Sequence, residues 1–312
     1  MNVLIPNTIT LDLSANTTDT FVEYNVDAPI DPSHSDAEVL VVWGNPAANL
    51  QSAVATLPNL KFIQTLAAGP DAVVQAGFAP HVQICSGRSL HDGPVAEHTL
   101  AMMLYVARDM QRLAESQAQR TWRGQMVADQ AHPVTRQLYT LAGATVVILG
   151  FGSIAARLAP MLTALGSHVI GVANQAGERH GYPVVAMRDV AGVLPTADWV
   201  VSILPHTPAT EKIVDAQFLA QMNPTSVFVN VGRGKTVDES ALVATLRAGT
   251  IRAAAIDVTH VEPNPADSPL WDCPNLLITP HVAGGRPIGG DALLVRQLAA
   301  WRAGEPLANR VV

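Results

Sequence analysis

The stretch that decides the fold reads Thr145-Val-Val-Ile-Leu149, followed directly by Gly150-Phe-Gly-Ser-Ile-Ala155. An apolar, β-branched run leads into a G-x-G-x-x-A turn, and apolar residues then recur at helical spacing. A glycine-rich turn between a strand and a helix binds the pyrophosphate of a dinucleotide, because the helix N-terminus presents free amides there. We therefore predict a dinucleotide site at this turn and keep a purely structural turn as the alternative. The residues expected at the cofactor are Gly150, Gly152, Ser153 and Ile154.

The turn lies near the middle of the 312-residue chain, so a second folding unit must be built around it. Short apolar runs bounded by turn residues predict five strands before it. They are Val3–Ile5, Thr20–Tyr24, Val39–Trp43, Leu60–Gln64 and Val82–Cys85. A helix is predicted to begin at Asp92-Gly93-Pro94, to run for roughly twenty residues toward Trp122, and to link two domains.

Strands and helices alternate regularly after Thr145. Later strands are expected at His168–Val172, Trp199–Leu204, Ser226–Asn230, Ile251–Asp257 and Leu276–Thr279. Such alternation indicates a parallel, doubly wound sheet. We expect an α/β protein with two doubly wound parallel-sheet domains of Rossmann or flavodoxin type. The cofactor domain, 99–284, is inserted in a substrate domain made of 1–98 and 285–312, and a last helix at Asp291–Arg302 packs on that substrate domain.

The composition excludes several classes of function. The net charge of −7 argues against a nucleic-acid partner, because phosphate binding requires a basic surface. The two cysteines, Cys85 and Cys273, are far apart and have no metal-ligand spacing, so we expect neither a disulfide nor a metal site. No apolar stretch is long enough to span a membrane, and the N-terminus lacks the features of a signal peptide. We therefore expect a cytoplasmic protein without a membrane partner.

One residue type is missing from the predicted cofactor site. An acidic side chain that binds the ribose hydroxyls of NAD normally lies about 20 residues beyond the turn, at the end of the second strand. Ala173 occupies that place here, Asn174 follows it, and Arg179 lies a few residues further on. Without the acid a 2′-phosphate is not repelled, so NADP(H) is slightly favoured over NAD(H), with Asn174 at the ribose. The alternative is that this loop contacts NAD in another way.

Three polar residues follow later strands of the predicted sheet. Arg233 lies between two glycines after the strand that ends at Asn230, where a guanidinium can bind a carboxylate or a polarised carbonyl. Glu262 and His281 follow two successive strands, so we expect them to meet. A carboxylate on one imidazole nitrogen favours the charged ring, and the other nitrogen can then give a proton to a ketone oxygen. A surface arginine and an ordinary loop histidine are the alternatives.

The order of these motifs resembles the D-isomer-specific 2-hydroxyacid dehydrogenase family. The resemblance extends to three further segments: Gln64–Asp71 is similar to its carboxylate-binding loop, Val95–Thr99 to its interdomain helix, and Ile203–Thr210 to the segment beneath the nicotinamide. It implies hydride transfer between NAD(P)H and a small 2-oxo acid to give the D-2-hydroxy acid. Glyoxylate, hydroxypyruvate and branched 2-oxo acids stay open as substrates.

The resemblance also implies roles for individual residues. His281 would be the acid/base, Glu262 its partner, and Arg233 a further catalytic residue that binds the substrate. Backbone amides of the substrate loop would bind the carboxylate, and these belong to Ala67, Ala68 and Gly69. The remaining residues expected at the cofactor are Leu204, Pro205, Thr210, Val231, Gly232 and Asp257. Members of the family are typically dimers, so a homodimer is expected. A dinucleotide-sensing binding protein of the same fold with little turnover remains the alternative function.

Overall fold

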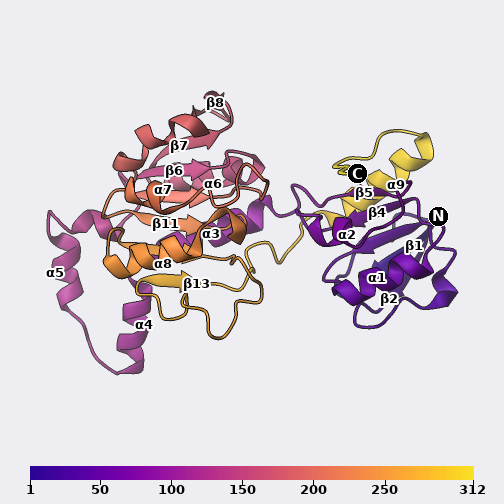
Figure 1. The fold of residues 1–312 in the computed structure, drawn as a ribbon, viewed down its shortest axis with the longest axis horizontal. Helices are drawn as coiled ribbons and strands as arrows, with labels where there is room; N and C mark the ends of the chain where they lie inside the picture. The colour runs from indigo at the N-terminus through magenta and orange to yellow at the C-terminus, as the bar shows by residue number, and fades with distance from the viewer. The chain divides into compact units, whose positions relative to one another are not determined.

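The computed structural model describes residues 1–312 and divides into two compact units. The first consists of residues 1–91 and 286–312, and the second, residues 92–285, is inserted between these segments (Figure 1). The domain boundary predicted at residues 98 and 99 falls inside helix α3 (Asp92–Ala107), and the whole helix belongs to the second unit. This is because Met102 and Met103 of α3 are buried in a core of the second unit. No helix is both long and apolar enough to cross a membrane.

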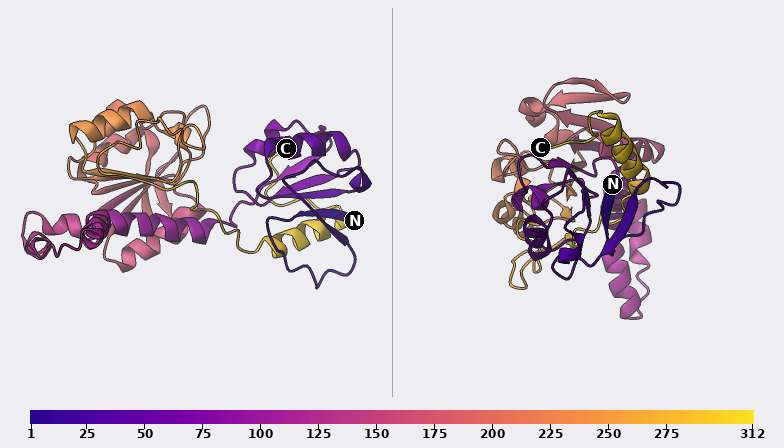
Figure 2. Two further views of the ribbon diagram at one scale, coloured as in Figure 1. Left: turned by 90° about the horizontal axis from the view of Figure 1, so that it is seen from below. Right: turned by 90° about the vertical axis from the view of Figure 1, so that its right-hand side faces the viewer.

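The first unit is built on a five-stranded parallel sheet in the order β2-β1-β3-β4-β5. Its strands are β1 (Asn2–Pro6), β2 (Thr20–Tyr24), β3 (Val39–Val42), β4 (Phe62–Thr65) and β5 (Gln83–Cys85). All five were predicted, with ends that differ by at most two residues. Helices α1 (Ala47–Thr56) and α2 (Asp71–Gln75) cover one face of the sheet. Helix α9 (Gly290–Ala303) covers the other face, so the predicted return of the last helix is confirmed (Figure 2).

The second unit is built on an eight-stranded sheet in the order β13-β12-β11-β10-β6-β7-β9-β8. The predicted strands are β6 (Thr145–Leu149), β7 (His168–Ala173), β10 (Trp199–Ser202), β11 (Val227–Asn230), β12 (Ala253–Ile256) and β13 (Leu276–Ile278). Two strands were not predicted, β8 (Gly177–Arg179) and β9 (Tyr182–Ala186), which form the only antiparallel pair of the sheet. Helices α3 and α6 (Ser153–Ala164) cover one face, and α7 (Ala216–Ala220) and α8 (Glu239–Ala248) cover the other (Figures 1 and 2). The expected α/β class with two parallel-sheet domains is confirmed.

The order of strands reverses between β6 and β10, and the glycine turn begins directly after β6. In open parallel sheets ligands bind outside the carboxyl ends of the strands at such a reversal point. Apart from Thr145 at the start of β6, every residue of both strands is buried, as their mostly apolar sequences lead one to expect of central parallel strands. Gly150 has a φ of +90°, and a Cβ there would lie 2.9 Å from the carbonyl oxygen of Ile203 in the loop after β10. Only glycine fits this position.

The predicted long helix toward Trp122 is wrong in its length. Helix α3 ends at Ala107, and Asp109 has a φ of +50°, which turns the chain before α4 (Met110–Ala118) begins. Helix α5 (Gln125–Ala131) follows after a loop that contains Trp122. The apolar periodicity continues through the break, which is why the sequence suggested one helix. Short 3-10 turns complete the fold at Pro32–His34, Arg136–Tyr139, Met187–Gly192, Leu194–Thr196 and Gly234–Thr236.

Candidate active site

The glycine turn ends at Gly152, which caps the N-terminus of α6 without a side-chain hydrogen bond. A Cβ placed on Gly152 would meet no atom within 4 Å, so open space lies above the turn. The backbone amides of the first turn of α6, including that of Ile154, form the N-terminal end of this twelve-residue helix. No side chain caps them. The Ser153 hydroxyl donates to Asp92 Oδ1 at 3.0 Å. The uncapped N-terminus of α6 and the open space beside Gly152 together fit the pyrophosphate of a dinucleotide.

The end of β7 lies beside this turn. Ala173 is buried and is the last residue of β7, and Asn174 after it is exposed. Arg179 pairs with Tyr182 across the β8–β9 hairpin, so the two side chains lie on the same face of the hairpin. The Tyr182 ring lies 5.9 Å from that of Phe151 in the glycine turn. The exposed Arg179 therefore lies on the face of the hairpin whose tyrosine contacts the glycine turn.

The loop after β11 places Arg233. A Cβ on Gly232 would lie 2.5 Å from the carbonyl oxygen of Leu204, and one on Gly234 would lie 2.0 Å from that of Thr259. The two glycines therefore allow three strand-end loops to pack together, with the half-buried Arg233 between them. The Asn230 side chain holds this loop: it accepts from the Gly232 amide at 3.1 Å and donates to the Arg233 carbonyl at 3.2 Å.

His281 and Glu262 meet as expected. The distance from His281 Nδ1 to Glu262 Oε2 is 2.6 Å, and Glu262 Oε1 accepts from the Thr259 amide at 3.0 Å. Because an ionised carboxylate can only accept, Nδ1 of His281 carries the proton. Nε2 is therefore the nitrogen left to exchange a proton with a ligand.

The two groups shift each other's pKa in opposite directions. The hydrogen bond to Glu262 raises the pKa of His281 above its ordinary value, against the opposing effect of burial. Burial acts to raise the pKa of Glu262, but the hydrogen bonds from His281 and Thr259 outweigh it and keep that pKa below its ordinary value. Arg233 acts on both groups through its charge, lowering the pKa of each. The structure therefore gathers the three predicted polar residues into one electrostatically coupled group.

Asp257 has a different environment from the one expected. Its side chain is 1% exposed, and both carboxylate oxygens accept hydrogen bonds from the loop that carries His281. The donors are the Thr279 hydroxyl at 2.5 Å and the amides of Val282 and Ala283 at 3.0 Å each. The carboxylate thus binds the neighbouring loop that carries His281, and a contact with nicotinamide remains a prediction.

Other residues predicted at the cofactor are placed around the same strand ends. Leu204 and Val231 are buried after β10 and β11. The Thr210 hydroxyl donates to the Pro205 carbonyl at 2.7 Å and accepts from the Thr207 amide at 2.8 Å. Thr210 therefore closes the turn that Pro205 begins.

In the first unit, the loop after β4 contains the predicted carboxylate-binding amides. The Ala67 amide donates to Thr65 Oγ1 at 3.1 Å, which leaves those of Ala68 and Gly69 as donors for a ligand. The carbonyl of Leu66 accepts from His91 Nε2 at 2.6 Å. A Cβ on Gly87 would lie 2.0 Å from the same carbonyl oxygen, so the loop is held closely on two sides. Nδ1 of His91 is buried without a partner.

The family model described as the D-isomer specific 2-hydroxyacid dehydrogenase NAD binding domain matches residues 100–283. The chain belongs to this family. It is 31% identical to a glycerate dehydrogenase of Methylorubrum extorquens over 80% of this chain and 78% of that protein.

Solved structures of the family agree over almost the full length. A D-isomer specific 2-hydroxyacid dehydrogenase family protein from Aeromonas salmonicida has a TM-score of 0.87 and 28% identity, covering 100% of this chain and 98% of its own. An NADPH-dependent glyoxylate/hydroxypyruvate reductase from Sinorhizobium meliloti, in complex with NADP and sulfate, has a TM-score of 0.80 and 25% identity, covering 99% and 97%. The protein is thus a 2-hydroxyacid dehydrogenase family member with an NAD(P)-binding domain.

Some residues of this candidate site were not found from the sequence. The Thr259 amide and the Asn230 side chain orient Glu262 and the Arg233 loop, but hydrogen bonds of this kind have no sequence signature. Asn230 alone carried a signal, because it is a polar residue at the end of an apolar strand.

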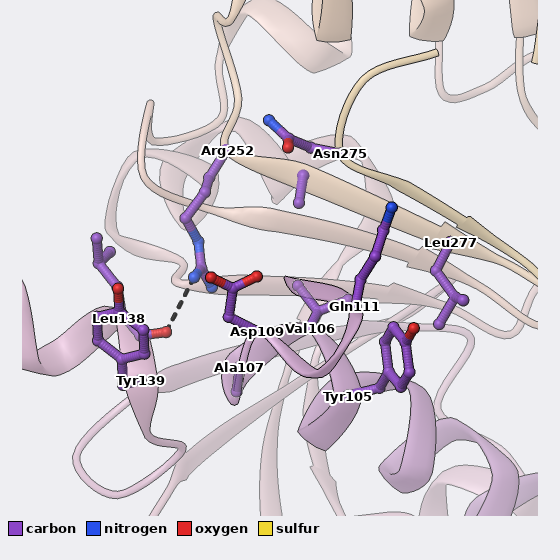
Figure 3. A pocket seen from close by; sticks show the side chains of 11 residues that line it. Tyr105, Val106, Ala107, Asp109, Gln111, Leu138, Tyr139, Arg252, Asn275 and Leu277 are labelled. Atoms are coloured by element: carbon purple, nitrogen blue, oxygen red, sulfur yellow. Dashed lines mark hydrogen bonds between the residues drawn. The ribbon is translucent and has the colours of Figure 1, made fainter. Parts of the chain in front are cut away.

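A separate cavity of about 250 Å³ lies at the other end of the sheet (Figure 3). Arg252 lines it, donates to the Leu138 carbonyl at 2.9 Å and lies 5.7 Å from the centre of the Trp199 ring. Arg252 precedes β12, whereas Asp257 follows that strand. The cavity is therefore distinct from the site around His281.

Proposed function

We propose that the protein reduces a small 2-oxo acid with NAD(P)H to the D-2-hydroxy acid. The observation that carries this proposal is the His281–Glu262 contact beside Arg233 at the carboxyl ends of the parallel strands. A bound NAD(P)H supplies the hydride for the carbonyl carbon. The carbonyl oxygen takes one proton from His281, so the products are the 2-hydroxy acid and NAD(P)⁺.

The chain's own residues account for the remaining steps. Nδ1 of His281 is held by Glu262, so Nε2 gives the proton to the carbonyl oxygen, and Glu262 stabilises the charged ring beforehand. Arg233 offers a guanidinium that binds the carbonyl and carboxylate of the substrate. The free amides of Ala68 and Gly69 bind the carboxylate. In the reverse direction, His281 accepts the proton of the hydroxyl group.

The cofactor is proposed to bind at the glycine turn with its pyrophosphate on the N-terminus of α6. The open space over Gly152 and the uncapped helix start support this placement. We propose a slight preference for NADP(H). Position 173 carries alanine in place of an acidic residue that would repel the 2′-phosphate, and Arg179 lies on the hairpin face next to the glycine turn. A structural relative that was solved with NADP is in line with this choice.

A panel of 2-oxo acids assayed with both cofactors tests the function. The panel contains glyoxylate, hydroxypyruvate and a branched 2-oxo acid, and chiral analysis of the product identifies the D-hydroxy acid. We expect steady oxidation of the reduced cofactor, with a higher kcat/KM for NADPH than for NADH. Replacing Arg179 by Ala should narrow that difference. Tight cofactor binding without turnover of any substrate would favour the sensing protein instead.

The role of His281 has its own test. His281→Asn removes the proton donor while keeping a side chain of similar polarity, so turnover should fall by a factor of about 10²–10⁴. Binding of NADPH, measured by fluorescence titration, should stay within about twofold, because the glycine turn is unchanged. Normal turnover in this variant would contradict the proposed mechanism.

We further propose that the protein works as a homodimer in the cytoplasm. Helices α4 and α5 and the loop between them expose apolar side chains, among them Trp122 in the loop, which is 96% exposed, and Val127 of α5, which is 73% exposed. A cavity of about 500 Å³ lies between these helices and is lined by Leu113, Trp122 and Met126. Exposed apolar surface of this kind is typical of a protein interface. Both cysteines are free thiols, as expected in a reducing compartment.

A further inference from the structure

We propose that His98 and Thr279 are positioning residues for His281 and act on it through the carboxylate of Asp257. This inference rests on the proposed function, in which His281 is the acid/base. His98 lies on α3 and Thr279 directly follows β13, so two elements far apart in the sequence meet at Asp257. The distance from His98 Nε2 to Thr279 Oγ1 is 3.0 Å, and that from His98 Nε2 to Asp257 Oδ1 is 3.4 Å.

The direction of these hydrogen bonds follows from the chemistry of the groups. An ionised carboxylate only accepts, so Thr279 donates its single hydroxyl proton to Asp257 Oδ1 at 2.5 Å. The Thr279 oxygen is then free only to accept, and the donor is the Nε2–H of His98. A directed chain therefore runs from His98 through Thr279 to Asp257.

The other side of Asp257 holds the loop of His281. Its carboxylate accepts from the amides of Val282 and Ala283, and its backbone carbonyl accepts from the His281 amide at 2.7 Å. His281 itself has a φ of +53°, a conformation that residues other than glycine seldom adopt. Such a conformation persists where the surroundings determine it. Thr279, Val282 and Ala283 thus anchor the loop on both sides of the imidazole.

The position of the His281 imidazole depends on this anchoring, because its hydrogen-bond partner Glu262 lies outside the loop. Glu262 precedes β13 and contacts His281 Nδ1 at 2.6 Å. A shift of the loop lengthens this contact and moves Nε2 away from its place at the substrate. Displacements of about 1 Å can lower catalytic rates by about 100-fold. Removing the Thr279 hydroxyl or the His98 donor should therefore act on turnover without removing a group that contacts the substrate.

Two matched pairs of variants test this inference. Thr279→Val and His98→Leu remove the hydroxyl and the donor, whereas Thr279→Ser and His98→Gln keep a hydroxyl and an N–H donor. His168→Leu replaces an exposed histidine at the start of β7 and controls for the loss of any histidine. The measurements are kcat and KM for the best 2-oxo acid, the Kd of NADPH, and an NMR titration of the His281 imidazole without substrate.

We expect Thr279→Val and His98→Leu to lower kcat by about 10- to 100-fold and to leave the Kd of NADPH within about twofold. The pKa of His281 should fall toward its ordinary value as the contact with Glu262 loosens. The groups that act on the imidazole through charge are Glu262, Arg233 and Asp257, and all three are retained in these variants. Thr279→Ser and His98→Gln should recover most of the turnover and the raised pKa.

Two results would overturn the inference. One is an unchanged kcat and an unchanged His281 titration in Thr279→Val and His98→Leu. The other is an equal loss in the serine and glutamine variants, which would point to general damage of the fold. The titration needs no substrate, so it decides the positioning role even if the wild-type protein turns over no 2-oxo acid. That last outcome would contradict the proposed function alone.

Discussion

At the scale of single residues, the site depends on one ion pair and on glycines that permit close approach. His281 and Glu262 lie 19 positions apart in the chain, yet they share a short hydrogen bond because their strands are neighbours in the sheet. Gly232 and Gly234 also depend on residues of neighbouring loops, which pack closely against them. Each has a backbone carbonyl of another loop where a Cβ would be, so alanine at either position would displace Arg233.

The prediction at this scale concerns Glu262→Gln. In the proposed reduction His281 gives the proton and must be charged, so the rate should fall as pH rises through its pKa. The pKa of His281 is raised mainly by its hydrogen bond to Glu262, and the neutral amide removes the charge that supports it. The falling limb of the pH profile of kcat should therefore move to lower pH. An unchanged profile would show that the two groups do not interact during turnover.

The same pair links stability to pH. The raised pKa of His281 makes its contribution complete below the unfolded value of 6.5, and the contribution is lost as pH rises through the folded pKa. The lowered pKa of Glu262 makes its contribution complete above the unfolded value of 4.5, and that is lost as pH falls through the folded pKa. The loss of stability in Glu262→Gln should be largest between these two values, as measured by urea unfolding.

At the scale of elements, the helix ends follow local sequence rules. The Asp238 side chain accepts from the Ala241 amide at the start of α8, as is typical of an aspartate at an N-cap, and Gly249 ends the helix in the left-handed conformation. The break between α3 and α4 does not follow such a rule, because Asp109 has a positive φ without being glycine. At the break, Asp109 lines the same cavity as Arg252, which comes from the loop before β12 (Figure 3).

Asp238→Ala tests the cap of α8. We expect the free energy of unfolding to fall by about 1 kcal/mol, which is typical for the loss of an N-cap side chain. Asp238→Asn keeps an acceptor and should lose less. The Asp238 hydrogen bonds lower its pKa, so the difference between the aspartate and alanine proteins should be present at neutral pH and fade as pH falls through that pKa. Equal stability of all three proteins at pH 7 would contradict a capping role.

At the scale of the whole molecule, the two units have separate cores. Each of the four apolar clusters is made of residues from one unit, and the first unit is completed by α9 from the end of the chain. The proposed dimer surface belongs to the second unit, on the arm formed by α4 and α5.

Trp122→Glu tests that surface. A charge in the middle of an apolar interface is costly to bury, so the variant should be largely monomeric where the wild type is dimeric. Light scattering coupled to size-exclusion chromatography measures this directly. Gln217→Glu adds one negative charge at an exposed position of α7, outside the residues that line the cavity between α4 and α5, and controls for the added charge. A wild-type protein that is monomeric at micromolar concentration would contradict the dimer.

The glycine turn, eleven of the thirteen strands and the identity of the polar residues that follow them could all be predicted from the amino-acid sequence. These depend on local patterns: apolar runs, turn residues and motifs with a fixed order. It could not give the β8–β9 hairpin, whose first strand is exposed and carries no apolar pattern. It also missed the break after Ala107, because apolar periodicity continues through it.

The contacts that hold the candidate site together could be found only in the folded structure. Asp257 was expected at the nicotinamide, and its burial and three loop donors could not be read from the chain. The contacts of His98 with Thr279, and of Gly87 with Leu66, join residues that are distant in sequence. Hydrogen bonds and close approaches of this kind arise where the loops at strand ends pack against one another or against a helix. No local pattern specifies them, because each depends on where other elements pack.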